Sequence, residues 1–151
     1  MNYAVKGLTI CTFAAVIAGC ASWDTEAYMP EDYQSSYTKV HECKKSTHPT
    51  GDYVTTWVSP EGAEAFKAGT RPLPVDTVLV KSQYSDSSCT DQTRFTVMKK
   101  GVEGSNEASA DWLWQLLDAD GQVKECCDGA SNGCVGCHTP CAADNYVCTK
   151  P

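Results

Sequence analysis

The stretch NGCVGCHTPC, residues 132–141, places three cysteines and a histidine within ten positions. Within it, Cys134, Cys137 and His138 form the pattern C-x-x-C-H. At the cysteine and histidine frequencies of this chain, chance produces C-x-x-C about 0.6 times but C-x-x-C-H only about 0.01 times, and the longer pattern is the attachment motif of c-type haem. The histidine is therefore the informative residue, and the motif predicts one covalently bound haem c.

The spacing of the motif fits this chemistry. Two thiols about one helical turn apart can each form a thioether to the edge of the porphyrin, and the next residue then places its imidazole under the iron. We predict that Cys134 and Cys137 are the thioether anchors and that His138 is the axial iron ligand. The main alternative is a disulfide knot, because a zinc site would need two further ligands at suitable spacing.

The first twenty residues predict the compartment of these thiols. After the single Lys6, LTICTFAAVIA is an uncharged, mostly apolar run of 11 residues, which suits the core of a signal peptide and is too short for a membrane-spanning helix. The sequence IAGC, residues 17–20, resembles the lipobox of bacterial lipoproteins, in which the cysteine is lipidated. We predict a lipoprotein signal peptide over residues 1–19, a lipidated Cys20 and a location on the periplasmic face of a bacterial membrane. Ordinary cleavage near Ala21 is the alternative.

Length and charge limit the number of domains and the partners that the mature chain can have. Removal of residues 1–19 leaves 132 of 151 residues and takes Lys6 away, so that 11 basic residues face 19 acidic ones, a balance of −8. This length suits one domain, and the acidic balance argues against nucleic acid or anionic lipid headgroups as partners. Residues 21–38 hold four carboxylates and no basic residue. We therefore predict a flexible acidic tether over residues 20–38 and a haem c domain over residues 39–151.

The remaining cysteines are predicted to pair. Cys11 leaves with the signal peptide and Cys20 carries lipid, so eight of the ten cysteines remain in an oxidising compartment. If two of them bind haem, six are left for disulfides: Cys43, Cys89, Cys126, Cys127, Cys141 and Cys148. Both eight and six are even numbers, so parity does not choose between the haem and the all-disulfide interpretation. Adjacent Cys126 and Cys127 are poor partners for each other, so we expect each to join a different cysteine, with Cys141 or Cys148 bracing the haem turn.

The segments around the motif predict a sheet. A short helix is expected over residues 37–45 and a strand over 53–58. Ser59 as N-cap, Pro60 and a terminating Gly69 predict one helix. Further strands are expected over residues 75–84, 94–99 and 111–117, followed by a turn at 118–121 and a return over 122–125. The predicted fold class is α+β, mainly an antiparallel sheet with a few short helices and a C-terminal haem-binding turn.

The order of SPEGAEAFKAG, VDTVLVKSQY, RFTVMKKG, DWLWQLLDADG and CVGCHTPCAADNYV resembles the cytochrome P-460 family. The resemblance covers roughly residues 50–147. It implies an antiparallel sheet that encloses one side of a c-type haem, often in a homodimer. Members include enzymes that oxidise hydroxylamine or convert it with nitric oxide, and their relatives, the c′-beta cytochromes, bind diatomic gases.

The resemblance also assigns a role to Lys81. This residue aligns with the lysine that, in the hydroxylamine-oxidising members, forms a covalent bond to the porphyrin. By strand alternation Lys81 shares a face with Thr77, Leu79 and Gln83, and a solvated strand lysine is the alternative. Where the enzymes of the family carry an arginine in the first strand, this chain has Val54.

Other residues have plainer interpretations. We expect His41 and His48 to be surface histidines rather than sixth iron ligands, and Met98 to be a core residue. Trp112 and Trp114 are expected in the core or in the wall of a haem pocket. The carboxylates of Asp118, Asp120 and Glu125 are expected in a turn and on solvated surface.

Two classes of function remain open at this stage. One is a haem enzyme that binds hydroxylamine or nitric oxide and passes electrons to a redox partner protein. The other is a cytochrome that binds gas or carries electrons without turnover of a substrate. A disulfide-rich lipoprotein without haem is a weaker third interpretation. In each case we expect no nucleic acid partner, and membrane contact only through the lipid anchor.

Overall fold

The computed structural model describes residues 26–46, 52–127 and 133–151, and for Cys126 and Cys127 the backbone only. Six strands form one antiparallel sheet in which the spatial order of the strands equals their order in the chain. The strands are β1 (Thr38–Lys45), β2 (Tyr53–Val58), β3 (Val78–Tyr84), β4 (Gln92–Lys100), β5 (Trp112–Asp118) and β6 (Val123–Cys127). The helices are α1 (Tyr33–Ser36), α2 (Pro60–Lys67), η1 (Glu107–Ser109), α3 (Cys134–His138) and η2 (Thr139–Asp144). The predicted fold class is confirmed.

Alternation along the central strands gives the sheet two apolar faces. Val80 of β3 and Val97 of β4 are paired in register and buried on one face, while their neighbours Leu79 and Met98 are paired and buried on the other. Each face needs a cover, because a sheet that is apolar on both sides is stable only between two layers.

The N-terminal segment covers the first face. Met29, just before α1, and Tyr33, its first residue, are buried there. The Tyr33 ring packs edge-on against Trp57 and Phe95, with 5.6 Å and 5.9 Å between ring centroids. The Tyr33 hydroxyl forms a hydrogen bond with the Ser82 hydroxyl at 2.9 Å. The prediction of a flexible tether up to residue 38 is therefore wrong for residues 26–38, because a few apolar residues within this acidic segment complete the core. Residues 1–25 lie outside the described residues.

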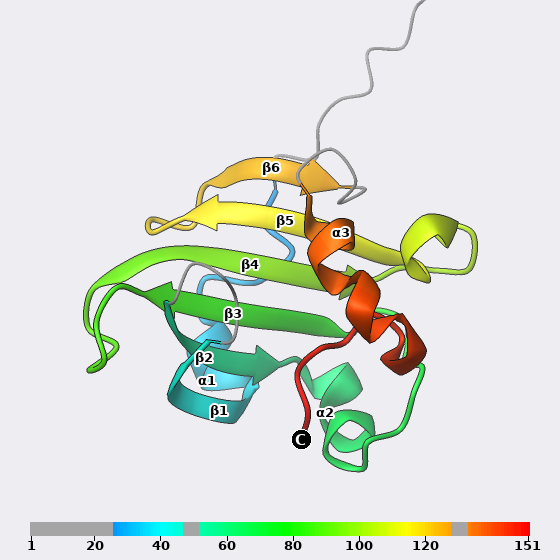
Figure 1. Cartoon of the computed structure of the whole chain (residues 1–151), viewed down its shortest axis with the longest axis horizontal. Helices are drawn as coiled ribbons and strands as arrows, with labels where there is room; N and C mark the ends of the chain where they lie inside the picture. Colours follow the sequence, from blue (N-terminus) through cyan, green and yellow to red (C-terminus); the bar gives the residue numbers. More distant parts are fainter. Residues whose placement is uncertain (1–25, 47–51, 128–132) are drawn as a thin grey trace, which may run out of the picture.

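The second face is covered by α2 and by the C-terminal segment. Figure 1 shows α2 at the end of the sheet and α3 with η2 lying across it. Phe66 of α2 is fully buried in this cluster, as is Val147 after η2. The helix begins and ends as predicted, with Pro60 in the first turn and Gly69 at a φ of 68° just beyond the end. The Ser59 hydroxyl accepts a hydrogen bond from the Val78 N–H at 3.0 Å, which links the start of α2 to β3.

One predicted element has the wrong type. The segment from residue 37 to 45 was expected to be helical, but it forms β1, which pairs with β2 from Thr38 opposite Val58 to Lys45 opposite Tyr53. A short isolated helix is only marginally stable, whereas a strand here can pair with the edge of β2. The tertiary partner therefore determines the conformation of this segment. The strand is irregular, with register shifts on both sides of His41.

The remaining strands and the final turn agree with the sequence. Asp118 accepts hydrogen bonds from the backbone N–H groups of Asp120 at 3.1 Å and Gln122 at 2.9 Å, which closes the turn into β6. Across the part of the chain that the structure describes, no helix is long and apolar enough to span a membrane.

Candidate cofactor site

The C-x-x-C-H motif forms a helix of its own. α3 spans Cys134–His138 and starts after Gly133, whose φ of 75° lets the chain turn sharply into the helix. The Cys137 N–H donates to the Gly133 carbonyl at 3.2 Å. Cys134 and His138 are half-buried and Cys137 is exposed. The helical turn thus presents two thiols and an imidazole beside one face of the sheet.

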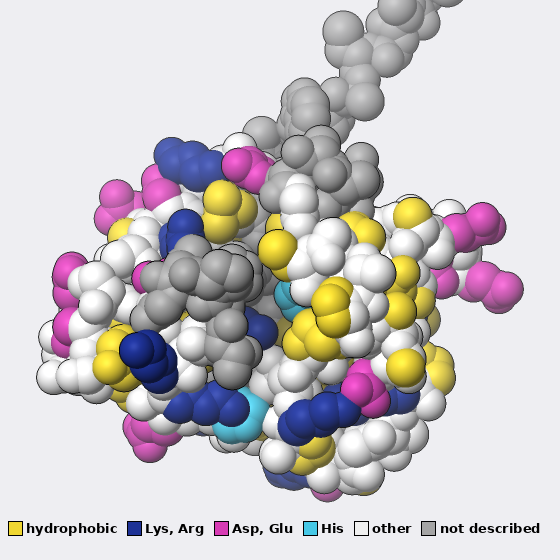
Figure 2. All heavy atoms as spheres, in the orientation of Figure 1, with side chains coloured by type: hydrophobic (Ala, Val, Ile, Leu, Met, Phe, Trp, Pro, Cys, Tyr) yellow, Lys and Arg dark blue, Asp and Glu magenta, His cyan; other side chains and the backbone are white. Residues whose placement is uncertain are grey.

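A pocket of about 280 Å³ lies between α3 and the sheet. All three motif residues line it, and the opposite wall comes from β2 to β6, with Val54, Lys81, Gln83, Arg94, Thr96, Trp114, Leu116 and Glu125. Figure 2 shows the hollow on this side of the molecule, with a histidine and basic side chains in it and around it. The register explains the wall, because Thr56, Lys81, Thr96, Leu116 and Glu125 are successive partners across the strands.

His138 is held in a defined orientation. Its Nδ1 lies 2.8 Å from the carbonyl oxygen of Tyr146, and its ring packs edge-on against Trp114 with 4.8 Å between ring centroids. A carbonyl only accepts, so this bond places the proton on Nδ1 and leaves the lone pair of the neutral imidazole on Nε2. That tautomer is the one that a metal-binding histidine adopts when a backbone carbonyl orients it.

Lys81 lies in the wall of the pocket. It is half-buried on β3, and it also lines a second cavity of about 30 Å³ that His138, Met98 and Cys148 share. Its amine makes no hydrogen bond and no ion pair with the described residues. Burial lowers the pKa of its amine, and the nearby charge of Lys44 lowers it further. Lys81 is therefore not the fully solvated strand lysine of the alternative interpretation.

Arg94 adds a second cation to the wall, and sequence reasoning missed it. Its Nε donates to Gln83 Oε1 and its Nη2 to Asp52 Oδ2, both at 2.8 Å. Gln83 in turn donates to the Thr96 hydroxyl at 3.2 Å. Val54, Gln83 and Arg94 are paired across three neighbouring strands. The resemblance implies an arginine at residue 54, and Arg94 supplies a guanidinium in the same cross-strand row. Only the register of three strands reveals this.

The comparison with protein families now bears on the site. The Cytochrome P460 family model matches residues 30–149, most of the chain. The chain belongs to the cytochrome P460 family. No curated protein matches the sequence significantly. Membership implies a haem cofactor, and it therefore favours haem binding over a disulfide knot as the interpretation of the motif.

The residues of the pocket fit the haem of a cytochrome P460. Two thiols and an imidazole with its Nδ1 proton already engaged face the pocket from one short helix. Trp114, Leu116 and Val54 supply an apolar wall, and the guanidinium of Arg94 is a cation that suits a carboxylate of a porphyrin. Over the described ranges, no group of three or more histidines, cysteines, aspartates or glutamates is arranged to hold a metal ion.

Met98, Trp112 and His41 differ in burial and in their position relative to the pocket. Met98 and Trp112 are buried, and Met98 borders the small cavity. His41 is half-buried on β1 and is not among the residues that line the pocket, and its pKa is lowered by burial and by the charges of Lys44 and Lys81. His48 lies outside the described residues.

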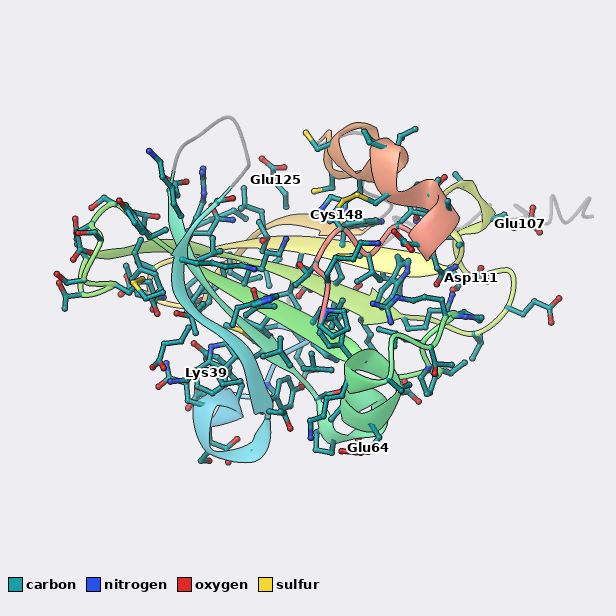
Figure 3. All side chains as sticks on the ribbon, turned by 60° about the horizontal axis from the view of Figure 1, so that its bottom comes forward. Lys39, Glu64, Glu107, Asp111, Glu125 and Cys148 are labelled. Carbon is teal, nitrogen blue, oxygen red and sulfur yellow. A yellow bond between two sulfur atoms is a disulfide. The ribbon has the colours of Figure 1, made fainter. Side chains whose placement is uncertain are left out.

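Glu125 is exposed, as predicted, and it also lines the pocket. Figure 3 shows Glu125 and Cys148 on the same side of the sheet as the C-terminal helices.

Two disulfides are described, and they correct the predicted connectivity. Cys43 pairs with Cys89, and Cys141 pairs with Cys148, seven positions away. The expectation that Cys126 and Cys127 each join one of these four cysteines is wrong, because the four pair with one another. The first bridge ties β1 to the β3–β4 turn, and the second closes a short loop behind His138. The side chains of Cys126 and Cys127 lie outside the described residues.

Proposed function

We propose that this cytochrome P460 is an exported mono-haem c-type cytochrome in which Cys134 and Cys137 bind the haem covalently and His138 is the axial ligand. The observation that carries the proposal is the hydrogen bond from His138 Nδ1 to the Tyr146 carbonyl at 2.8 Å, which directs Nε2 of a neutral imidazole to the role of ligand. Both thiols line the same pocket as this imidazole.

A haem bound there supplies an iron that takes small nitrogenous molecules and accepts their electrons. The protein contributes the surroundings. Trp114 and Leu116 keep part of the pocket apolar and exclude water, while Arg94 presents a guanidinium fixed by Gln83 and Asp52.

The more specific proposal is that Lys81 is joined to the porphyrin and that the protein oxidises hydroxylamine. A lowered pKa increases the share of neutral amine, which is the nucleophilic form. The new N–C bond replaces one N–H and one ring C–H and releases two protons and two electrons, so its formation needs a two-electron oxidant such as a peroxide. The location of Lys81 beside the motif residues supports this assignment.

A second candidate function is a cytochrome that binds nitric oxide or carbon monoxide, or that carries electrons, without turnover. Val54 favours it, because the strand position at which the enzymes of the family have an arginine is apolar here. In both cases we propose a redox partner protein, a homodimer, and attachment to the periplasmic face of a bacterial membrane through a lipidated Cys20.

The first test is the mass and colour of the mature protein. We expect intact mass spectrometry of the denatured protein to show one haem retained on the chain, and a pyridine haemochrome spectrum of the c type. Haem should be lost from the chain in a Cys134→Ala, Cys137→Ala double variant, and iron ligation should change in His138→Ala. A wild-type chain that carries lipid and disulfides but no haem would refute the proposal.

A further inference from the structure

The loop that follows the motif orients the proposed axial ligand. Tyr146, whose carbonyl accepts the hydrogen bond from His138 Nδ1, lies inside the loop that the Cys141–Cys148 disulfide closes. Cys148 Sγ itself is 3.8 Å from the same Nδ1. The covalent bridge and the acceptor carbonyl are therefore adjacent parts of one small structure behind the imidazole.

The backbone of this loop is in a conformation that needs support. Asn145 has a φ of 56° and Tyr146 a φ of 62°, so two successive non-glycine residues are left-handed. Side chains with a Cβ disfavour this region, and tyrosine more than asparagine. A loop with these two residues holds its shape only if the surroundings fix it.

Three contacts besides the disulfide fix the loop. The Trp112 indole N–H donates to the Asn145 carbonyl at 2.7 Å, and the Tyr146 hydroxyl donates to the Ala108 carbonyl at 3.0 Å. Val147 is 1% exposed in the core cluster that also contains Trp112. The loop is thus fastened to β5 on one side and closed by the disulfide on the other.

We propose that the Cys141–Cys148 disulfide and Trp112 are positioning groups for His138. They hold the Tyr146 carbonyl at Nδ1, which fixes the tautomer and the orientation of the imidazole. This inference rests on the proposed role of His138 as axial ligand. A carbonyl that accepts from Nδ1 makes the ligand a stronger electron donor, which favours ferric over ferrous iron. The bridge thereby affects the reduction potential of the haem without touching it.

The test compares two double variants of the haem-loaded protein. Cys141→Ala, Cys148→Ala opens the loop behind His138, while the matched control Cys43→Ala, Cys89→Ala removes the other described disulfide, between β1 and the β3–β4 turn. We expect the first variant to show a higher midpoint potential and a lower Fe–His stretching frequency by resonance Raman spectroscopy. The control should match the wild type in both, although it also loses a disulfide.

A third variant keeps the disulfide and changes the other support of the loop. Trp112→Phe removes the N–H that donates to Asn145 and retains an aromatic ring. We expect the same direction of change with a smaller size. Trp112→Phe also tests the proposal if the Cys141→Ala, Cys148→Ala variant does not accumulate as folded protein.

The outcomes separate the two proposals. If His138→Ala leaves the haem spectrum as in the wild type, His138 is not the ligand and the proposed ligation fails. If His138→Ala changes the spectrum while both Cys141→Ala, Cys148→Ala and Trp112→Phe keep the wild-type potential and Fe–His frequency, the ligation holds and the positioning role is wrong.

Discussion

Lys81 is an unusual residue for a strand of this kind. A half-buried amine without a hydrogen bond or an ion pair to the described residues is costly, because burial penalises its charge. Lys81 lies beside the haem motif, in a wall that also contains Trp114, Leu116 and Arg94 with its own partners. Such a residue is more easily explained by chemistry in the pocket than by stability.

The first residue-scale prediction concerns the spectrum. If Lys81 is joined to the porphyrin, wild-type protein should have a markedly red-shifted ferrous absorption, because a bond from nitrogen to the macrocycle alters its electronic structure. Lys81→Ala should restore an ordinary c-type spectrum, keep both thioethers and lose hydroxylamine turnover while it still binds nitric oxide. Absorption spectra, peptide mass mapping and a turnover assay measure these effects.

Lys45→Ala is the matched control, since Lys45 is exposed on β1, does not line the pocket and does not contribute to the lowered pKa of Lys81. It should keep the shifted spectrum. An ordinary c-type spectrum in the wild type, together with a haem peptide without any mass link to β3, would leave the gas-binding or electron-carrying function in place of the enzyme.

At the scale of elements, the N-terminal segment is a structural layer. Tyr33 is 4% exposed, packs against Trp57 and Phe95, and bonds to Ser82 on the face of the sheet opposite the pocket. We expect Tyr33→Ala to lower the free energy of unfolding by about 3–5 kcal/mol, as for other large aromatic residues removed from a core. Chemical denaturation monitored by tryptophan fluorescence measures the change.

Two variants make this prediction specific. Tyr33→Phe keeps the ring and loses the hydrogen bonds of the hydroxyl with Ser82 and Gln34, so we expect a loss of about 1–2 kcal/mol. Glu31→Ala, at an exposed position in the same segment, should change stability very little. Equal stability of Tyr33→Ala and the wild type would instead fit a flexible tether.

The sequence predicts those elements whose signal is local. β2, α2, β3, β4 and the hairpin of β5 and β6 were expected within a few residues, because strand propensity, Pro60, Gly69 and the Asp118 turn act over short distances. β1 and the segment around Tyr33 were predicted wrongly because their conformation depends on partners elsewhere: the edge of β2 and one apolar face of the sheet.

The same distinction holds for the site. Cys134, Cys137 and His138 form a contiguous motif, so the sequence alone identifies them. Arg94 and Asp52 lie 42 positions apart and meet only through the strand register. The disulfides also depend on tertiary structure, since Cys43 meets Cys89 across the end of the sheet.

At the scale of the whole molecule, the proposed anchor is the testable feature. If Cys20 carries lipid, the wild type should fractionate with membranes and dissolve only in detergent, because two or more acyl chains give stable attachment. Cys20→Ala should move the protein to the soluble fraction or block its maturation, and intact mass should show the loss of lipid. The control Cys11→Ala, within the predicted signal peptide, should fractionate as the wild type does. Wild-type protein without lipid would favour ordinary cleavage near Ala21.

The order of strands has a consequence for assembly. Each strand of the sheet pairs with its neighbours in the chain, and α3 comes after β6. A chain that crosses a membrane from its N-terminus would therefore deliver the entire wall of the pocket before Cys134 and Cys137 emerge. Local pairing of this kind forms early, so the thiols can arrive at a surface that is already shaped for the porphyrin. In a haem-loaded protein the porphyrin would then meet a wall that is already folded, and the loop from Cys141 to Cys148, which follows the thiols in the chain, would complete the site.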